Sequence, residues 1–353
     1  MPNPQDLLAE LKKVKYPGFS RDIVSFGMVK DIQVGSHGVT VELTASSAQQ
    51  DTIVEIRRQV EGVLREVSGL PVRVEVEQTR PAAAEAPHEK VGLPGVRHII
   101  AVASGKGGVG KSTVAVNLAC AMVARGHRVG LLDADVYGPS VPMMLGITDK
   151  PTVREDRRIV PVEKLGMKVI SMGMFLGERT PVIWRGPMVT KLITEFLRNV
   201  EWGTLDYLVL DLPPGTGDAQ LTIAQQVPLS GGIIVTTPQD VALLDVKRGV
   251  AMFNQVHAPV LGVVENMSYH LCSGCGSRAE IFGHGGGEAM ARQFGVPFLG
   301  ELPLLSAIRA AGDRGLPIVA QDPHHPQSRA LLEIADAIDT QMIERAAGVH
   351  ARS

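Results

Sequence analysis

The chain has 353 residues, of which 44% are hydrophobic and 20% charged, as is usual for a soluble globular protein, and this length favours two domains over one. Its 35 Lys and Arg residues nearly balance its 37 Asp and Glu residues, and aromatic residues make up 4%, so the composition argues against surfaces for nucleic acid, anionic membrane or stacked bases and sugars. Three cysteines are too few for a disulfide framework, and the chain begins without a signal-peptide pattern and contains no membrane-spanning apolar run, so we expect a cytoplasmic protein with no membrane partner.

Residues 1–78 are expected to form a small α+β domain. Apolar residues at helical spacing predict helices, and strict alternation of apolar and polar residues predicts strands. The predicted helices are Asp6–Lys13 and Asp51–Val67, and the predicted strands are Val29–Val34, Val39–Leu43 and Val72–Val76. Residues 79–95 are rich in Ala, Pro and charged residues and lack apolar periodicity, which predicts an extended linker.

Residues 96–353 follow a different pattern, because short runs that are apolar on both faces alternate with longer amphipathic segments. The runs are His98–Ala103, Arg128–Leu132, Tyr207–Leu210, Gly232–Thr237 and Pro259–Glu265. Continuous apolar strands alternating with helices predict an α/β fold, in which helices cover both faces of a mostly parallel sheet. Ligands of such sheets bind at the carboxyl ends of the strands.

The first of these strands runs directly into SGKGGVGKST, Ser104–Thr113, and a predicted helix at Lys111–Ala124. The stretch fits the phosphate-binding pattern G-x-x-x-x-G-K-[ST], in which backbone N–H groups and a helix N-terminus surround phosphate oxygens. Lys111 would reach the β- and γ-phosphates and the Ser112 hydroxyl would bind Mg²⁺. The predicted nucleotide-binding residues of this loop are Gly105, Lys106, Gly107, Gly108, Val109, Gly110, Lys111, Ser112 and Thr113.

Carboxylates at the ends of two other strands are expected to complete the nucleotide site. Asp133 and Asp135 lie in LLDAD, and Asp211 ends the strand of LVLDLPPGTGD. Asp211 at its strand end can hold Mg²⁺ through water. Strand-end aspartates also serve as helix caps, but the neighbouring phosphate loop favours the nucleotide role for all three.

The stretch LCSGCG, Leu271–Gly276, resembles half of a four-ligand metal site, with a structural turn that binds no metal as the alternative. Cys272 and Cys275 can converge on one metal, and two copies of the chain would supply four thiolates, enough for one [4Fe–4S] cluster. Their spacing alone suits zinc equally well, and the flanking glycines disfavour a thioredoxin-like redox pair. His270 is a candidate additional ligand or hydrogen-bond donor to a ligand, whereas Cys120, among small apolar residues of a predicted helix, is expected to be buried.

The additional lysine of KGGVGKST, Lys106, resembles the deviant Walker A motif of the MinD, ParA and nitrogenase-iron-protein class. This resemblance implies an ATP-dependent dimer in which Lys106 contacts the partner's nucleotide. It also implies that Asp135 lies on switch I and orients the attacking water, that DLPPGTGD, Asp211–Asp218, is switch II, and that Asn266 recognises the adenine edge.

Further motifs narrow the resemblance to the Mrp/ApbC family of iron–sulfur carrier ATPases over roughly residues 95–320. They are WRGPM (Trp184–Met188), to which we assign no chemistry, DLPPGTGDAQLT (Asp211–Thr222), TTPQDVALLD (Thr236–Asp245), ENMSYHLCSGCG (Glu265–Gly276) and IFGHGGG (Ile281–Gly287). The family implies a homodimer that binds and slowly hydrolyses ATP with Mg²⁺, with Lys106, Lys111 and Asp135 as catalytic residues. It also implies a [4Fe–4S] cluster shared through Cys272 and Cys275, with apo iron–sulfur proteins and other cluster-assembly factors as partners.

The N-terminal stretch RDIVSFGMVKDI, Arg21–Ile32, resembles the small domain that often precedes such ATPases and occurs in other iron–sulfur assembly factors. The chain departs from that domain's pattern twice, since YPGFSRD stands where an acidic D-P-E stretch is usual and TASSAQQD lacks a frequent cysteine. The sequence therefore gives no basis for a cluster or thiol role in this domain.

Two other functions share parts of this pattern. A MinD/ParA-like positioning ATPase would have the same phosphate loop and lysines. However, the segment Leu331–His350 carries four acidic residues and a single arginine, and no basic stripe marks a DNA surface, so membrane or nucleic-acid binding is not expected. A zinc-bridged assembly scaffold is the second alternative.

Overall fold

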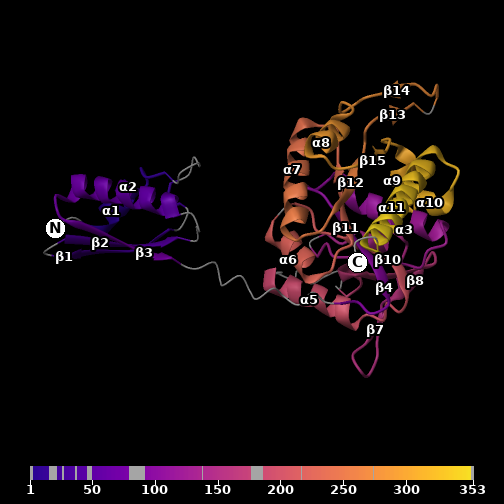
Figure 1. Cartoon of the computed structure of the whole chain (residues 1–353), viewed down its shortest axis with the longest axis horizontal. Coiled ribbons are helices and arrows are strands. Elements are labelled where there is room, and N and C mark those ends of the chain that lie inside the picture. Colours follow the sequence, from indigo (N-terminus) through magenta and orange to yellow (C-terminus); the bar gives the residue numbers. More distant parts are fainter. Residues whose placement is uncertain are drawn as a thin grey trace. The chain divides into compact units, whose positions relative to one another are not determined.

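The computed structural model describes residues 3–15, 22–25, 28–35, 38–45, 50–78, 92–136, 138–175, 186–215, 217–272 and 274–350. The chain divides into two compact units, one within Met1–His88 and the other within Glu89–Ser353 (Figure 1). Most of the predicted linker, residues 79–91, and Trp184 of WRGPM lie outside the described residues.

The N-terminal unit is a three-stranded sheet with two helices. Its elements are α1 (Pro4–Leu11), β1 (Val29–Gly35), β2 (Gly38–Ala45), α2 (Gln50–Ser68) and β3 (Val72–Gln78). Strand β2 pairs antiparallel with β1 and parallel with β3, so α2 forms the crossover that a parallel pair requires. Leu7 of α1, Val60 of α2 and Val41 of β2 meet in one buried core, which confirms the predicted α+β character.

The C-terminal unit is built on an eight-stranded sheet. Its strands are β4 (Val96–Ala103), β5 (Val129–Asp133), β8 (Val162–Lys164), β9 (Met167–Ser171), β10 (Leu205–Asp211), β11 (Gly231–Thr236), β12 (Val260–Glu265) and β15 (Phe298–Glu301). Their order across the sheet is β15-β12-β11-β4-β10-β5-β9-β8, and every neighbouring pair is parallel except β8 with β9. The predicted mostly parallel sheet is therefore confirmed.

Helices cover both faces of this sheet, as its doubly apolar strands require. On one face lie α3 (Lys111–Ala124), α4 (Val141–Met144), α9 (Ser306–Asp313), α10 (Ile318–Gln321) and α11 (Pro326–His350). On the other lie α5 (Gly186–Asn199), α6 (Asp218–Gln226), α7 (Asp240–Gln255) and α8 (Gly286–Phe294) (Figure 1). The predicted helix at Lys111–Ala124 is α3 with the same bounds.

Smaller elements lie outside the main sheet. A short 3₁₀ helix at Met172–Met174 follows β9, and β6 (Thr152–Val153) pairs with β7 (Ile159–Val160). The hairpin of β13 (His270–Leu271) and β14 (Arg278–Ala279) carries the predicted cysteine pair.

The strand register brings the ends of several strands together at the carboxyl edge. Asp211, the last residue of β10, is opposite Val102 of β4 on one side and Asp133 of β5 on the other. Glu265, the last residue of β12, is opposite Thr236 of β11 and Glu301 of β15. The predicted carboxylates therefore lie beside the loop that follows β4.

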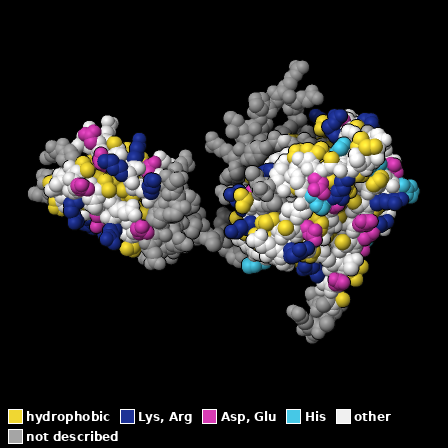
Figure 2. All heavy atoms as spheres, turned by 90° about the horizontal axis from the view of Figure 1, so that it is seen from above, with side chains coloured by type: hydrophobic (Ala, Val, Ile, Leu, Met, Phe, Trp, Pro, Cys, Tyr) yellow, Lys and Arg dark blue, Asp and Glu magenta, His cyan; other side chains and the backbone are white. Residues whose placement is uncertain are grey.

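Charged side chains of both signs are interspersed on the larger unit in the face drawn in Figure 2, and the described residues there form no continuous basic stripe. Among the helices that the structure describes, none is long and apolar enough to cross a bilayer.

Candidate functional site

Loop 104–113 joins β4 to α3 at the carboxyl edge of the sheet. Gly108 and Gly110 adopt φ angles of 82° and 80°, the left-handed region that glycine enters without steric cost. Gly110 is the N-cap of α3 and no side chain caps this helix end. The first-turn N–H groups of α3 are therefore available to an anion, whose charge the helix dipole also favours.

Two glycines of this loop are required by close packing. A Cβ atom on Gly105 would lie 1.8 Å from the Cβ atom of Asp245 in α7, and one on Gly110 would lie 2.3 Å from Nδ2 of Asn266. Neither position has room for a side chain, so the backbone of the loop is pressed against α7 and against the chain that follows β12.

Lys111 and Asp211 form a buried ion pair at the base of the loop. Lys111 Nζ lies 2.5 Å from Asp211 Oδ1 and 3.2 Å from Ser112 Oγ, and the two paired side chains are 6% and 0% exposed. The other carboxylate oxygen, Asp211 Oδ2, is buried without a hydrogen-bond partner. Burial raises the pKa of Asp211, an effect that the charge of Lys111 opposes.

Asp133 lies next to this pair but is occupied by protein donors. Its carboxylate accepts hydrogen bonds from the backbone N–H of Asp135 (3.0 Å) and of Val141 (3.3 Å) and from the Ser171 hydroxyl (2.9 Å). Burial and then the neighbouring charge of Asp211 raise the pKa of Asp133 to about 7. Asp133 does not line the cavity that lies over loop 104–113. Its hydrogen bonds hold the loop of Asp135 in place, and it has no direct contact with that cavity.

Asp135 sits nearer to that cavity. Its side chain is buried at the cavity wall, and Oδ1 accepts a hydrogen bond from Gly138 N–H at 3.2 Å. The fixed backbone of Asp135, held by Asp133, places this carboxylate on the same side of the loop as Lys111.

Lys106 and the stretch after β10 close the other side of the loop. Lys106 Nζ lies 3.4 Å from Oε1 of Gln239, the N-cap of α7. The carbonyl of Ser104 accepts hydrogen bonds from Gly215 N–H (3.0 Å) and Gln220 Nε2 (3.3 Å). The predicted switch II is thus attached to the first residue of the phosphate loop.

These residues enclose a cavity of about 200 Å³ over the loop. Its walls include the predicted residues Lys106, Gly107, Gly108, Gly110, Lys111, Ser112, Thr113 and Asp135. The glycine amides, the lysines and the Ser112 hydroxyl suit phosphate oxygens and their cation.

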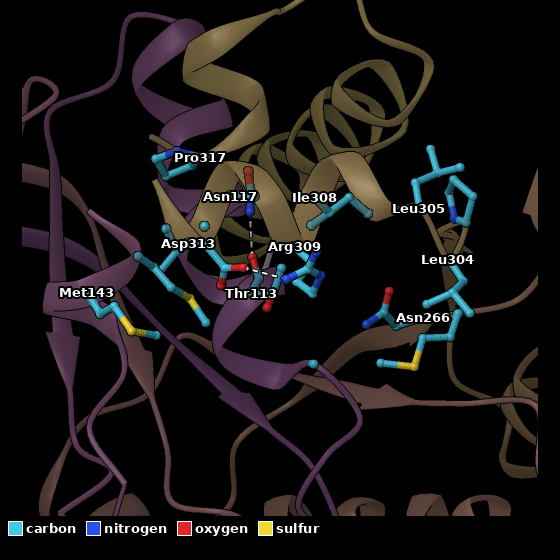
Figure 3. Close-up of a pocket in the computed structure, with 16 residues that line it drawn as sticks. Thr113, Asn117, Met143, Asn266, Leu304, Leu305, Ile308, Arg309, Asp313 and Pro317 are labelled. Atoms are coloured by element: carbon cyan, nitrogen blue, oxygen red, sulfur yellow. Dashed lines mark hydrogen bonds and ion pairs between the residues drawn. The ribbon is translucent and has the colours of Figure 1, made fainter. Parts of the chain in front are cut away.

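A second, more apolar cavity of about 320 Å³ shares Gly110, Thr113 and Met144 with the first. Asn266, Leu304 and Leu305 lie on one side of it and Met143 on the opposite side (Figure 3). Asn266 Nδ2 donates to the carbonyl of Val109 at 2.8 Å, which fixes its amide beside the phosphate loop. A nucleotide whose phosphates occupy the first cavity would place its base in the second.

The cysteine pair lies at the tip of hairpin β13–β14. Cys272 N–H donates to the carbonyl of Ser277 (2.9 Å), and Gly276 N–H donates to the carbonyl of Cys272 (2.8 Å), which closes the turn. Cys275 is exposed and Cys272 half-buried. Hydrogen bonds from the Ser277 hydroxyl and backbone N–H hold the pKa of Cys275 below its usual range, which favours the metal-binding thiolate.

Cys120 behaves differently, as predicted. It is buried in α3, and burial raises the pKa of its thiol to about 12, so it is inert at neutral pH.

The glycine-rich stretch GHGGGE at residues 283–288 resembles a second phosphate loop in sequence. However, a carboxylate of the protein itself occupies the N-terminus of the helix that follows it. Glu265 is fully buried, and its carboxylate accepts hydrogen bonds from Gly285 N–H (3.1 Å) and Gly287 N–H (2.5 Å) at the start of α8. The Ser268 hydroxyl donates to the same carboxylate at 2.6 Å. The α8 terminus therefore holds a protein carboxylate in place of an external anion.

Glu265, His284 and Glu301 bring three possible metal-ligand atoms within 4.8 Å of one another. Their contacts favour a hydrogen-bonded network instead, because Arg278 donates to both oxygens of Glu301 (3.1 and 3.3 Å) and His284 Nε2 lies 2.6 Å from Glu301 Oε2. This network was not predicted from the sequence. A carboxylate that ends an apolar strand, as in LGVVE, was its available signal.

The comparison with protein families gives two matches. Residues 95–339 match the family described as NUBPL iron-transfer P-loop NTPase, and residues 4–78 match the family described as iron-sulfur cluster assembly protein. The iron-sulfur cluster carrier protein of Haemophilus influenzae is 41% identical over 333 residues, which cover 94% of this chain and 90% of that protein.

Solved structures agree with these matches. A nucleotide-binding protein from Archaeoglobus fulgidus in complex with ADP is 41% identical, with a TM-score of 0.57 over 63% of this chain and 88% of that one. The cell division ATPase MinD of Pyrococcus furiosus is 22% identical, with a TM-score of 0.53 over 69% of this chain and 99% of that one, which shows a shared fold. With 245 residues matched from 95 to 339 and a phosphate loop of the expected geometry, the chain belongs to the NUBPL iron-transfer family of P-loop NTPases.

Proposed function

We propose that the chain is an ATP-dependent carrier of a [4Fe–4S] cluster, which two copies hold between them and transfer to apo iron–sulfur proteins. The observation that carries the proposal is the pair of Cys272, which is half-buried, and Cys275, which is exposed, in a chain whose ATPase unit belongs to an iron-transfer family. Its likeness to an iron-sulfur cluster carrier along 94% of its length supports the same reading.

The buried Lys111–Asp211 pair suggests how ATP is received. Lys111 neutralises Asp211 in the structure, and its side chain, which is 6% exposed, lines the phosphate cavity. Incoming β- and γ-phosphates offer Lys111 a stronger partner, and its departure leaves the Asp211 carboxylate free for a cation. Exchange of partners would therefore couple phosphate binding to cation binding.

Mg²⁺ fits the residues present. The unpartnered buried oxygen, Asp211 Oδ2, and the hydroxyl of Ser112 are hard oxygen donors beside the phosphate loop. When bound there, Mg²⁺ neutralises charge that develops on the phosphate oxygens during hydrolysis. Lys111 would contribute to the same neutralisation, and the amides of 105–113 would hold the phosphates.

Asp135 and Lys106 complete the proposed reaction. Asp135, whose backbone Asp133 holds, would orient the attacking water by accepting its proton in a hydrogen bond. Lys106 lies beside Gln239 in its own chain and is half-buried, so a partner's phosphates could draw it across a dimer interface. We propose that this contact makes dimerisation depend on nucleotide.

Asn266 would read the base. Its Nδ2 is committed to the Val109 carbonyl, so its Oδ1 is the atom left to accept a hydrogen bond from the adenine amino group. The apolar walls of the second cavity suit a flat heterocycle.

For the cluster, one chain supplies two thiolates and a [4Fe–4S] cluster needs four. Two hairpins facing each other across a twofold axis would complete the set. Because each chain holds half of the ligands, separating the subunits would release the cluster.

The N-terminal match suggests an assembly partner. We propose that residues 1–78 form a separate domain, joined by a linker at 79–95, that contacts other cluster-assembly factors, because they match the iron-sulfur cluster assembly family. The proposed setting is the cytoplasm, where reducing conditions keep thiols free.

The test is anaerobic reconstitution with iron and sulfide of the full chain, with iron content and native mass measured together. One four-iron cluster per dimer gives about two irons per chain. Cys272→Ala should lose this iron, whereas Cys120→Ala, a matched change at a buried thiol, should keep it.

Iron on a monomer would refute the shared site. Zinc bound tightly in place of iron, at about one ion per two chains, would favour the zinc-bridged scaffold instead.

A further inference from the structure

The chain that leaves β12 runs alongside the chain that leaves β15. Leu302 N–H donates to the carbonyl of Glu265 (2.8 Å), Ser268 N–H donates to the carbonyl of Leu302 (2.9 Å), and Leu304 N–H donates to the carbonyl of Tyr269 (2.7 Å). These bonds continue the β12–β15 pairing beyond the sheet edge as far as the base of the cysteine hairpin. A displacement of one segment is therefore expected to displace the other, because backbone hydrogen bonds connect them.

The same two segments form a wall of the apolar cavity. Asn266 and Met267 come from the first, and Pro303, Leu304 and Leu305 come from the second. Figure 3 shows Asn266 and Leu304 next to each other on this wall. A base that enters the cavity contacts residues that also support the hairpin.

His270 makes the most direct link between the two sites. Its Nδ1 lies 2.9 Å from the carbonyl oxygen of Leu304. A carbonyl can only accept, so Nδ1 carries the proton in this contact. Leu304 is thus bound at its N–H by Tyr269 and at its carbonyl by the side chain of His270, two residues before Cys272.

The second strand of the hairpin is attached to the same segment. Arg278 donates to both oxygens of Glu301, and its guanidinium lies 3.8 Å from the centre of the Tyr269 ring. The hairpin is therefore held on both strands by residues 301–304, while Cys275 at its tip is exposed.

We propose that His270 is a positioning residue that transmits occupancy of the nucleotide cavity to Cys272 and Cys275, acting through its hydrogen bond to Leu304. The proposal rests on the proposed function, because it takes the cavity to be the nucleotide site. A nucleotide that shifts Leu304 shifts the base of the hairpin and thereby changes the affinity of the cysteines for a metal. By linkage, a metal bound at the cysteines changes the affinity for the nucleotide by the same factor.

The experiment uses the full-length, reduced, metal-free protein, so its readout is independent of cluster assembly. The alkylation rates of Cys272 and Cys275 by iodoacetamide are measured peptide by peptide, with and without saturating ADP or a non-hydrolysable ATP analogue. In the wild type the nucleotide should change the rate by roughly threefold to tenfold, the range that one hydrogen bond can transmit.

For each cysteine, the readout is the ratio of the alkylation rate with nucleotide to the rate without it. His270→Leu should bring this ratio to near one, while the nucleotide affinity measured by calorimetry stays unchanged. His270→Asn retains a donor near the position of Nδ1 and should restore the ratio. His324→Leu, a change at an exposed histidine between α10 and α11, is the matched control and should behave as the wild type.

An unchanged ratio in His270→Leu would overturn the proposal, as would a wild type that binds nucleotide without any change in alkylation. Loss of iron from reconstituted His270→Leu at an unchanged ratio would make His270 a ligand instead. If His270→Leu binds nucleotide poorly, Arg278→Gln serves as the second variant, because it loosens the hairpin from Glu301 outside the cavity. This change should also bring the ratio closer to one. Failure of the wild type to bind nucleotide at all would refute the proposed function itself.

Discussion

At the base of the phosphate loop, Lys111 and Asp211 already have each other as partners and are almost wholly buried. At the hairpin tip, Cys275 is exposed. Among the described residues, its thiol forms side-chain hydrogen bonds with Ser277 and Cys272. The first region is shaped by the fold, so its ligand replaces internal contacts. The second is half of a site in the proposed function, and the fold supplies only its position. Changes in the two regions should therefore affect stability very differently.

The largest effect is expected for Lys111→Ala. This change leaves Asp211 buried without a counter-charge, so the free energy of unfolding should fall by about 3 kcal/mol, and ATP hydrolysis should fall by about a hundredfold or more. Chemical denaturation and a phosphate-release assay measure the two effects.

Lys106→Ala is the control in the same loop. Lys106 is half-buried and its side chain contacts Gln239 at 3.4 Å, so its removal should leave stability nearly unchanged. Equal destabilisation by both changes would contradict the contrast between the two lysines.

The pH dependence of stability should reveal Asp133. Its pKa is raised from 3.8 to about 7 by burial and by Asp211, so the native state binds a proton that the unfolded state has released. The contribution of Asp133 to stability should therefore fall by a few kcal/mol as the pH rises from about 4 to 7 and remain constant above 7.

Asp133→Asn removes this titration. Denaturation midpoints measured for both proteins at several pH values should diverge across that window, and parallel curves would refute the assignment. The nucleotide-free protein is required, because bound phosphates would alter the charge around Asp133.

A smaller effect is expected for Gly105→Ala. The new Cβ would collide with Asp245 at 1.8 Å, so the loop or α7 must shift, at a cost of about 2 kcal/mol. Gly107→Ala is matched to it, because the nearest heavy atom to that Cβ is 4.0 Å away. Thermal unfolding should separate the two variants, and equal melting temperatures would refute the close-packing argument.

The smallest effect on stability is expected at the hairpin. Cys275→Ala removes an exposed side chain, so the free energy of unfolding should change by less than about 0.5 kcal/mol while bound iron is lost. A large destabilisation of the metal-free protein would show that the hairpin is integral to the core, contrary to the comparison above.

The main elements of the fold followed from hydrophobic pattern. All five predicted strands of the larger sheet and the helix at Lys111–Ala124 are present, with bounds that differ by at most two residues. Strands β8, β9 and β15 were missed. They lie toward the sheet edges and are short, and Phe298–Glu301 is half-buried throughout, so they lack the run of apolar residues that marks a central strand.

Parts of the site could not be predicted because they depend on contacts distant in sequence. Asp133 and Asp211 look alike as strand-end aspartates, but Ser171 donates to Asp133 from β9, whereas Asp211 faces Lys111. The attachment of His270 to Leu304, 34 residues away, is likewise invisible to spacing.

The carboxylate of Glu265 at the start of α8 has a consequence for how a nucleotide orients itself. Two glycine-rich helix ends lie along one edge of the sheet, and a triphosphate attracted to either would bind in competing poses. Glu265 saturates the amides of one end and adds a negative charge that repels phosphate. In the proposed function, the uncapped end at Gly110 would then receive the phosphates, and the chain would select a single direction for its ligand before any base contact is made.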